Sequence, residues 1–284
     1  MPRGSHLITG LAAHGDLRWV AVDLTTALEE ARLRLDLSPI ATVALGRALA
    51  GAVLVQRIAL KTPTRLVLEI SGDGPLGRVV AEASASGDMR GLVGNPRQPT
   101  PAEGLRLAAA IGCGVLRVTR EGPRKAYTSQ VALVSGELGD DLTHYLEQSE
   151  QIRSAVLLGV LLRPDGVAAA GGLIVEALPG TEDERITQLE TNLRQRDGVS
   201  VYLDRGGISA LVDLVLDGFD REPLETVELR YRCGCTREGL QARLLPIARQ
   251  DLTALLGPDG RCEAECAFCG ERYVFDADEL LSTH

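Results

Sequence analysis

The cysteines of this chain are concentrated near its end. Of six cysteines, Cys113 lies alone mid-chain and the others lie between positions 233 and 269. Four of these form a Cys-x-Cys pair and a Cys-x-x-Cys pair, Cys233 with Cys235 and Cys266 with Cys269. Four thiolates are enough ligands for tetrahedral zinc, and in a reducing compartment such clustering favours a metal over disulfides. The spacing therefore predicts one zinc site.

The neighbours of the cysteines refine this prediction. Gly270 suits a tight turn in which backbone amides point at the Cys266 and Cys269 sulfurs. Cys262 lies four residues before Cys266, so a ligand pair of Cys262 with Cys266 stays open as an alternative, and oxidation could scramble disulfides among the three thiols. Cys113, between two glycines at the start of an expected strand, is interpreted as a small core residue instead of a redox sensor.

The segment around the predicted zinc site has few apolar residues from which to build a core. Its expected core is Leu240, Leu244, Leu245, Leu252, Leu255, Leu256, Tyr273 and Phe275. This apolar core is smaller than a domain of such size normally needs unless a metal or disulfides stabilise it. Structural zinc in small peptides supplies roughly 10 to 16 kcal/mol of folding free energy. We therefore expect residues 230–284 to depend on their metal.

Length, composition and net charge limit the class of protein to which the chain can belong. A length of 284 residues is typical of one main domain plus a smaller domain or segment. A content of 45% hydrophobic and 24% charged residues is typical of a folded protein. The net charge of -9 and the 3% aromatic content argue against a nucleic-acid partner. Residues 40–60 are apolar but interrupted by Arg47, Gln56 and Arg57, which indicates a buried helix and not a membrane span.

The beginning of the sequence shows no secretory signal, so we expect a cytoplasmic protein. The opening residues up to His6 resemble the remnant of a protease-cleaved tag, with a native origin as the alternative, and are given no structural weight. The four histidines have no serine or cysteine partner in a recognisable nucleophile motif. No enzyme is therefore predicted.

Periodicity predicts an α+β first domain at residues 1–179. Thr25 or Thr26 can cap a helix through Arg34, and Ser38-Pro39 predicts the start of a helix that reaches Ile58. Another helix is expected at 141–149. Apolar alternation predicts strands, in a largely antiparallel sheet, at 17–22, 66–70, 79–81, 89–93, 115–119, 127–134, 156–162 and 167–177.

Residues 180–229 have a different pattern. Thr181 with Glu184 matches a capping box, and two short amphipathic helices are expected, the second at 208–216 after a break at Gly206-Gly207. Helices this short cannot form a core alone. We interpret this segment as a helical, redox-sensitive linker that is folded only while it is docked, followed by a small zinc-binding domain at 230–284.

The chain resembles the redox-regulated heat shock protein 33 family over nearly its whole length. The similar stretches are residues 38–50 (SPIATVALGRALA), 72–79 (GDGPLGRV), 145–154 (YLEQSEQIRS), 170–179 (AGGLIVEALP) and the cysteine tail. The resemblance implies an ATP-independent holdase that is idle when reduced and zinc-bound. It also implies that oxidation forms two disulfides, releases zinc, unfolds the tail and linker, promotes homodimerisation and exposes apolar surface for unfolded or oxidatively damaged client proteins.

The matching redox and zinc residues are Cys233, Cys235, Cys266 and Cys269. If they pair as Cys233–Cys235 and Cys266–Cys269, each bridge closes so short a loop that it restores only about 2 kcal/mol. Bridges this local cannot replace a metal that ties the two pairs together. Oxidation is therefore expected to unfold the small domain, so that the thiols act as a switch.

Two other functions remain as alternatives. One is a binding module in which a zinc ribbon is purely structural. The other is a thiol-disulfide oxidoreductase, although Cys266 does not open a helix after a strand as in thioredoxin-like proteins. The stretch Gly72–Gly77 matches a dinucleotide-binding pattern literally, but the following residues continue with strand periodicity, so we predict a hairpin turn there.

Overall fold

The computed structural model describes residues 4–59, 65–102, 104–122, 125–194, 198–247 and 249–281. Its contacts divide the chain into two compact units, Met1–Tyr231 and Arg232–His284. Helices and mainly antiparallel sheets confirm the predicted α+β class. Residues 1–3 of the suspected tag remnant and residue 60 of the apolar stretch lie outside the described residues.

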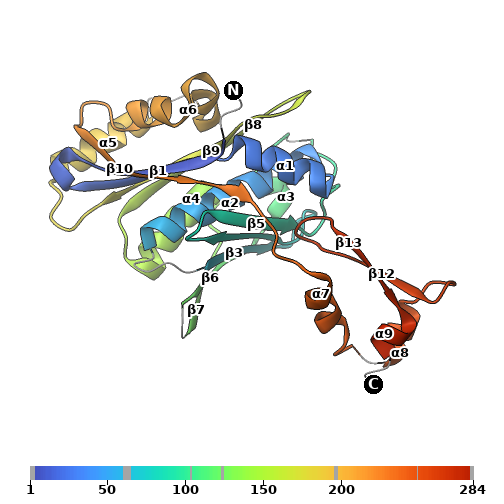
Figure 1. The fold of residues 1–284 in the computed structure, drawn as a ribbon. Coiled ribbons are helices and arrows are strands. Elements are labelled where there is room, and N and C mark those ends of the chain that lie inside the picture. Colours follow the sequence, from blue (N-terminus) through green and yellow to red (C-terminus); the bar gives the residue numbers. More distant parts are fainter. Residues whose placement is uncertain are drawn as a thin grey trace. The chain divides into compact units, whose positions relative to one another are not determined.

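The first unit contains two sheets with helices between them (Figure 1). The five-stranded sheet has the order β10 (Arg221–Glu228), β1 (His6–Ala12), β2 (Leu17–Asp23), β9 (Gly166–Ala177) and β8 (Ser154–Arg163). The six-stranded sheet has the order β11 (Arg230–Tyr231), β5 (Asp88–Val93), β4 (Val79–Ser84), β3 (Arg65–Gly72), β6 (Gly114–Glu121) and β7 (Ala126–Ala132). Among the described strands, only β11 and β5 pair in parallel.

Helix α2 (Pro39–Ala59) is the centre of this unit. Ser38 caps it, because its Oγ accepts a hydrogen bond from the Ala41 N–H at 3.4 Å, as the sequence predicted. The helix is long and apolar enough to cross a membrane, but 89% of its most apolar window is buried. It packs between the two sheets and is therefore a core helix of the unit.

Helix α1 (Thr25–Leu35) begins where predicted but is capped differently. Neither threonine caps it. The carboxylate of Asp23 accepts hydrogen bonds from the Thr25 N–H at 3.0 Å and the Thr25 hydroxyl at 2.7 Å. A residue at the end of a strand therefore caps the next helix.

The predicted strands of both sheets are confirmed, and the stretch Gly72–Gly77 is the predicted turn between β3 and β4. The short helix α3 (Leu107–Ile111) precedes β6. The helix expected at 141–149 starts earlier, as α4 (Leu138–Tyr145), and widens into a π-helical turn, η2 (Leu146–Glu150). A buried contact fixes this turn, since the Tyr145 hydroxyl donates to Glu150 at 2.7 Å and Arg120 pairs with the same carboxylate at 2.6 Å.

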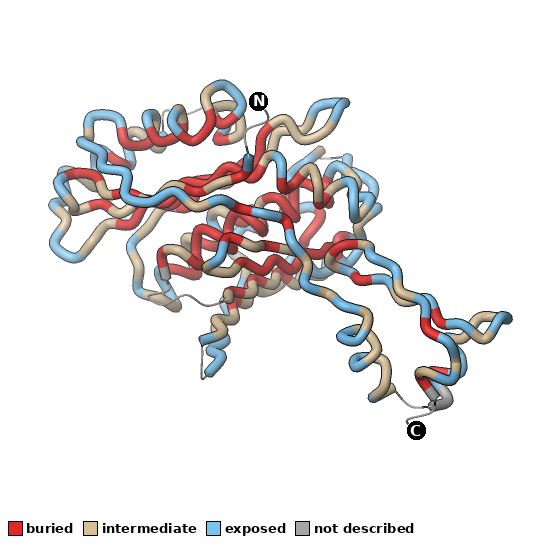
Figure 2. The backbone as a smooth tube through the Cα atoms, viewed as in Figure 1, coloured by how far each residue is buried: buried red, intermediate tan, exposed pale blue. Residues whose placement is uncertain are grey.

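Helices α5 (Asp183–Arg194) and α6 (Val199–Val215) cover the outer face of the five-stranded sheet (Figures 1 and 2). The break predicted at Gly206-Gly207 is a kink inside α6, because Gly207 has φ 66° and ψ -157°. The first half of α6, before the kink, was not predicted. The two helices and the sheet together form a second apolar cluster, distinct from the core around α2.

The predicted capping box at Thr181 is wrong. The Thr181 hydroxyl donates to the backbone oxygens of Asp16 and Leu178, at 2.9 and 2.7 Å, and α5 starts two residues later. Arg185 also pairs with Asp16 at 2.7 Å. These contacts join the start of α5 to the end of the turn between β1 and β2.

The other end of the segment is attached to the same turn. The carboxylate of Asp220 accepts a hydrogen bond from the His14 N–H at 3.0 Å. Ala13 and His14 both have positive φ, 54° and 56°, although neither is a glycine. Residues from both ends of the segment 180–229 therefore fix an unusual turn.

Strands β1 and β10 of the five-stranded sheet were not predicted. β1 begins at His6 and pairs with both β2 and β10, and Ser5, which is buried, accepts a hydrogen bond from the Ala27 N–H at 3.0 Å. The opening residues from Ser5 on therefore do have a structural role. β10 is an exposed edge strand, and Pro223 lies at the irregularity in its pairing with β1.

The second unit is built from short elements. These are α7 (Arg237–Leu244), α8 (Arg249–Ala254), the hairpin of β12 (Arg261–Glu265) with β13 (Arg272–Asp276), and α9 (Ala277–Leu281). Because the division of the chain into residues 1–179, 180–229 and 230–284 concerns which parts fold independently, it stays a prediction.

Candidate metal centre

The four cysteines predicted as ligands converge in the second unit. All four sulfur atoms lie within 4.8 Å of one another. The Sγ atoms of Cys233 and Cys266 are 3.7 Å apart, and those of Cys235 and Cys269 are 3.4 Å apart. Cys266 and Cys269 are buried, while Cys233 and Cys235 are half-buried.

The Cys-x-x-Cys pair occupies the turn between β12 and β13. The N–H groups of Cys269 and Gly270 donate to the Cys266 carbonyl at 3.2 and 2.8 Å, and the Cys266 N–H donates to the Glu271 carbonyl at 2.9 Å. Gly270 has φ 71°, a conformation that glycine adopts without strain. The backbone amides of Phe268 and Glu271 point at the Cys266 and Cys269 sulfurs. The predicted tight turn is confirmed.

The Cys-x-Cys pair precedes helix α7. Thr236 caps this helix, since its hydroxyl oxygen accepts a hydrogen bond from the Gly239 N–H at 3.1 Å. The Tyr273 hydroxyl, from β13, lies 3.4 Å from the Cys235 sulfur. Tyr273 was expected only as a core residue, and its hydroxyl contact could not be read from sequence because it depends on the register of the hairpin.

The sulfur positions fit a tetrahedral metal. A zinc ion with four bonds of about 2.3 Å places its sulfur ligands about 3.8 Å apart. The observed separations of 3.4 and 3.7 Å are close to this value. The four residues could therefore hold one zinc ion, with all ligand positions occupied by protein.

The electrostatics of the four thiols also favour the binding of a cation. Burial raises the pKa of the Cys269 thiol well above its ordinary value, and burial likewise raises the pKa of Cys266. At Cys235, burial also acts to raise the pKa, but hydrogen bonds from Tyr273 and the neighbouring thiols outweigh it, and the pKa is lowered. Four thiolates this close repel one another. A bound divalent cation would remove that penalty.

The core of this unit is as small as predicted. Its apolar cluster consists of buried Cys262, Phe275 and Leu280, with partly buried Leu240, Leu244, Leu256, Ala264 and Tyr273 around them. The Arg237 guanidinium lies 4.5 Å from the centre of the Phe275 ring and pairs with Glu279 at 2.8 Å. Leu252 is buried as expected, but Leu255 is 52% exposed, so its assignment to the core was wrong.

The two remaining cysteines do not join the cluster. Cys262 is 3% exposed and lies in β12 opposite Phe275. It is therefore a core residue, and the alternative ligand pair with Cys266 does not form. Cys113 was expected in a core and is instead exposed. Its backbone exchanges hydrogen bonds with Asp73, at 2.8 and 3.0 Å, at the point where Gly112 turns the chain from α3 into β6.

Comparison with known protein families agrees with this geometry. Residues 5–276 match the family described as Hsp33 protein. The chain belongs to the Hsp33 family.

Individual relatives support this membership. A 33 kDa chaperonin of Thermus thermophilus is 43% identical over 291 residues, which cover 97% of this chain and 85% of the relative. A 33 kDa chaperonin of Bacillus licheniformis is 39% identical over 281 residues and is covered to 97%. The crystal structure of the 33 kDa chaperonin from Thermotoga maritima matches with a TM-score of 0.89 and 36% identity, covering 99% of this chain and 97% of that one.

These relatives support a chaperone function for this Hsp33 family member. The geometry of the Cys-x-x-Cys pair is in line with that function. In a thioredoxin-like site such a pair opens a helix after a strand, whereas here it forms the turn of a β-hairpin.

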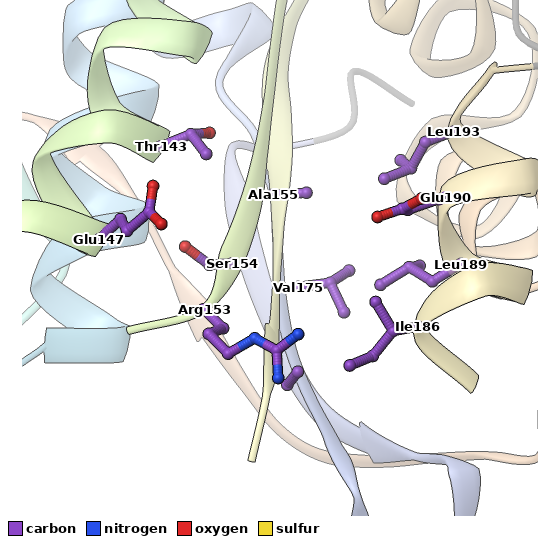
Figure 3. A pocket seen from close by; sticks show the side chains of 11 residues that line it. Thr143, Glu147, Arg153, Ser154, Ala155, Val175, Ile186, Leu189, Glu190 and Leu193 are labelled. Atoms are coloured by element: carbon purple, nitrogen blue, oxygen red, sulfur yellow. The ribbon is translucent and has the colours of Figure 1, made fainter. Parts of the chain in front are cut away.

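A second feature of this Hsp33 chain is a cavity of about 250 Å³ beside helix α5 (Figure 3). Ile186, Leu189 and Leu193 of α5 line one side. Ala155 of β8 and Val175 of β9 line the sheet side, and the remaining lining residues are Thr143, Glu147, Arg153, Ser154, Ala177 and Glu190. The apolar side chains of α5 therefore do not fill the space between the helix and the sheet.

Proposed function

We propose that this protein is a redox-regulated, ATP-independent holdase of the cytoplasm. Its reduced form binds one zinc ion through Cys233, Cys235, Cys266 and Cys269 and is idle. Oxidation pairs Cys233 with Cys235 and Cys266 with Cys269, and zinc is released. The zinc-binding unit and the linker 180–229 then unfold, the chain dimerises, and apolar surface captures unfolded or oxidatively damaged client proteins.

One observation carries this proposal: four convergent thiols lie in a unit whose apolar core is very small. Structural zinc contributes roughly 10 to 16 kcal/mol to the folding of small domains. The two proposed bridges restore only about 2 kcal/mol each because they close very short loops. The exchange of metal for disulfides is a net loss, so oxidation should unfold this unit.

Which cysteines pair on oxidation decides how much stability the zinc-binding unit keeps. Two sulfur contacts of the cluster join Cys233 to Cys266 and Cys235 to Cys269, which are separated by 33 and 34 positions in the chain. Bridges between these pairs would contribute about 4 kcal/mol each and would tie the two halves of the unit together. Oxidation would then restore about twice as much stability as the local bridges do, and the two halves of the unit would stay linked without the metal. Mapping of the disulfides therefore tests the switch directly.

The linker is proposed to respond because its helices depend on a neighbouring surface. The apolar residues of α5 and α6 pack on the five-stranded sheet, and α5 leaves a cavity beside it. Release of the helices would uncover the sheet residues Ala12, Leu17, Trp19, Ala21, Leu157, Ala169, Leu173 and Val175, which are buried in this cluster. This uncovered face is the proposed client-binding surface.

The proposal is tested by treating the reduced, zinc-loaded protein with peroxide at mildly raised temperature. We expect zinc release, loss of four of the six titratable thiols, and suppression of client aggregation by stoichiometric protein only after treatment. Zinc is measured with a chromogenic chelator and aggregation by light scattering. Retained zinc together with six titratable thiols would refute the switch, and catalytic reduction of insulin would indicate an oxidoreductase instead.

Filling the cavity beside α5 should make the linker harder to release. Ala155→Val adds two methyl groups at the sheet side of the cavity, where Figure 3 shows the Ala155 side chain facing α5. We expect the docked state to gain about 1 kcal/mol, and amide exchange in α5 of the reduced protein to slow about fivefold. Activation by peroxide should be slower as well.

Ala126→Val is the matched control, because Ala126 is exposed on the edge strand β7. It should leave exchange in α5 and the rate of activation unchanged. Faster exchange in Ala155→Val would mean that the cavity cannot accept the added volume and would contradict the prediction.

A further inference from the structure

Cys262 is a thiol next to the metal centre but separated from it by the fold. It lies in β12, directly opposite Phe275 of β13, and is 3% exposed. Phe275 and Leu280, both fully buried, complete its surroundings. In the folded unit this thiol is therefore shielded from oxidants and from other thiols.

The hairpin also sets the distance from Cys262 to the cluster. Cys262 lies within β12, and Cys266 follows the last residue of the same strand. Four residues of extended strand span about 13 Å, whereas the Cα atoms of a disulfide are at most about 7 Å apart. A bridge between Cys262 and Cys266 cannot form while the hairpin exists.

We propose that Cys262 is a thiol-disulfide exchange site that acts only after the zinc-binding unit has unfolded; this inference rests on the proposed function. The Cys262 thiolate attacks the Cys266 sulfur of the Cys266–Cys269 bridge. A Cys262–Cys266 bond forms, the Cys266–Cys269 bond breaks, and Cys269 leaves as a thiolate, which takes up the proton that Cys262 lost. The exchange is redox-neutral and needs no further reagent.

The two bridges close loops of similar length, so the unfolded chain should contain comparable amounts of each. Their consequences for refolding differ. The Cys266–Cys269 bridge spans a turn that the folded hairpin also contains. The Cys262–Cys266 bridge instead requires β12 to stay disrupted, so the hairpin cannot refold while this bridge exists. The shifted bridge thus prolongs the unfolded, active state until a reductant removes it.

The test uses the full-length wild-type protein, oxidised with peroxide under unfolding conditions, quenched in acid and alkylated at free thiols. Cleavage after Arg261 and Arg272 places Cys262, Cys266 and Cys269 in one peptide, and cleavage after Glu263 and Glu265 separates Cys262 from Cys266. We expect bridged peptides alkylated on Cys269 and bridged peptides alkylated on Cys262 in comparable amounts.

Each outcome has a distinct meaning. Alkylation of Cys262 in all bridged peptides would overturn the exchange and leave the proposed function intact. Alkylation of all three cysteines after peroxide would mean that no bridge forms, and the proposed function itself would fail. Alkylation of Cys262 in the folded, reduced protein would contradict its shielding.

A second measurement follows the return to the zinc-bound state. After dilution into a limiting concentration of a monothiol reductant with zinc present, Cys262→Ala should regain zinc several-fold faster than the wild type. Cys113→Ala, which removes the exposed cysteine outside this unit, should match the wild type. Equal rates for all three proteins would show that Cys262 does not prolong the oxidised state.

Discussion

Replacing Cys269 with serine is expected to abolish tight zinc binding and to leave residues 232–281 without stable structure in the reduced protein. Cys269 is buried, and its sulfur lies 3.4 Å from that of Cys235. A serine hydroxyl is not ionised at neutral pH and is a poor zinc ligand. Without the metal the unit loses a contribution of roughly 10 kcal/mol or more, which its few buried apolar residues cannot replace.

Metal analysis and hydrogen exchange check this prediction. Zinc per chain should fall to near zero, and amides of β12 and β13 should lose their protection, whereas amides of α2 in the first unit should keep theirs. Because we propose that loss of this unit also releases the linker, the variant should suppress client aggregation without peroxide. Cys113→Ser is the matched control and should behave as the wild type.

A Cys269→Ser protein that keeps one zinc ion and a protected hairpin would show that the metal does not stabilise this unit. A variant that loses zinc and unfolds the hairpin but remains idle has a different meaning. It would show that the linker does not respond to the state of the zinc-binding unit.

Replacing Leu211 with aspartate is expected to activate the reduced protein while zinc remains bound. Leu211 is fully buried between α6 and the five-stranded sheet. Burying an unpaired carboxylate costs several kcal/mol, which is comparable to what one kinked helix gains by docking. α6 should therefore leave the sheet, uncover its apolar face and bind clients without oxidation.

Ser209→Asp introduces the same residue on the exposed face of α6 and serves as the control. Zinc content, fluorescence of an apolar-surface dye and client aggregation should be measured for both variants. Only Leu211→Asp should bind the dye and suppress aggregation, and both should retain zinc. Leu211→Asp could show rapid amide exchange in α6 but neither bind the dye nor suppress aggregation. That result would exclude the uncovered sheet as the client-binding surface.

The sequence predicted those parts of the molecule that are determined by local chemistry. Ser38-Pro39 marks a helix start because the cap and the proline act within one turn, and α2 begins at that point. The four convergent cysteines were predicted because their spacing and the following glycine describe a zinc turn before any tertiary contact is known.

Other parts depend on contacts that sequence patterns do not encode. β10 has no apolar alternation, since it pairs with β1 through its backbone while its side chains face solvent. Thr181 fits a capping box, yet its hydroxyl binds the backbone of Asp16, far away in the chain. Cys113 resembles a core residue by composition, but the turn at Gly112 directs it outward.

The attachment of the segment with α5 and α6 at both ends has a consequence for client release. Before α5, the Leu178 N–H donates to the Asp16 carbonyl at 2.8 Å, and after α6, β10 pairs with β1 along its whole length. If these ends stay attached, the released helices remain an intramolecular competitor at an effective concentration on the order of millimolar. Any client must bind against this competition, so reduction and zinc uptake could displace it without a separate unloading factor.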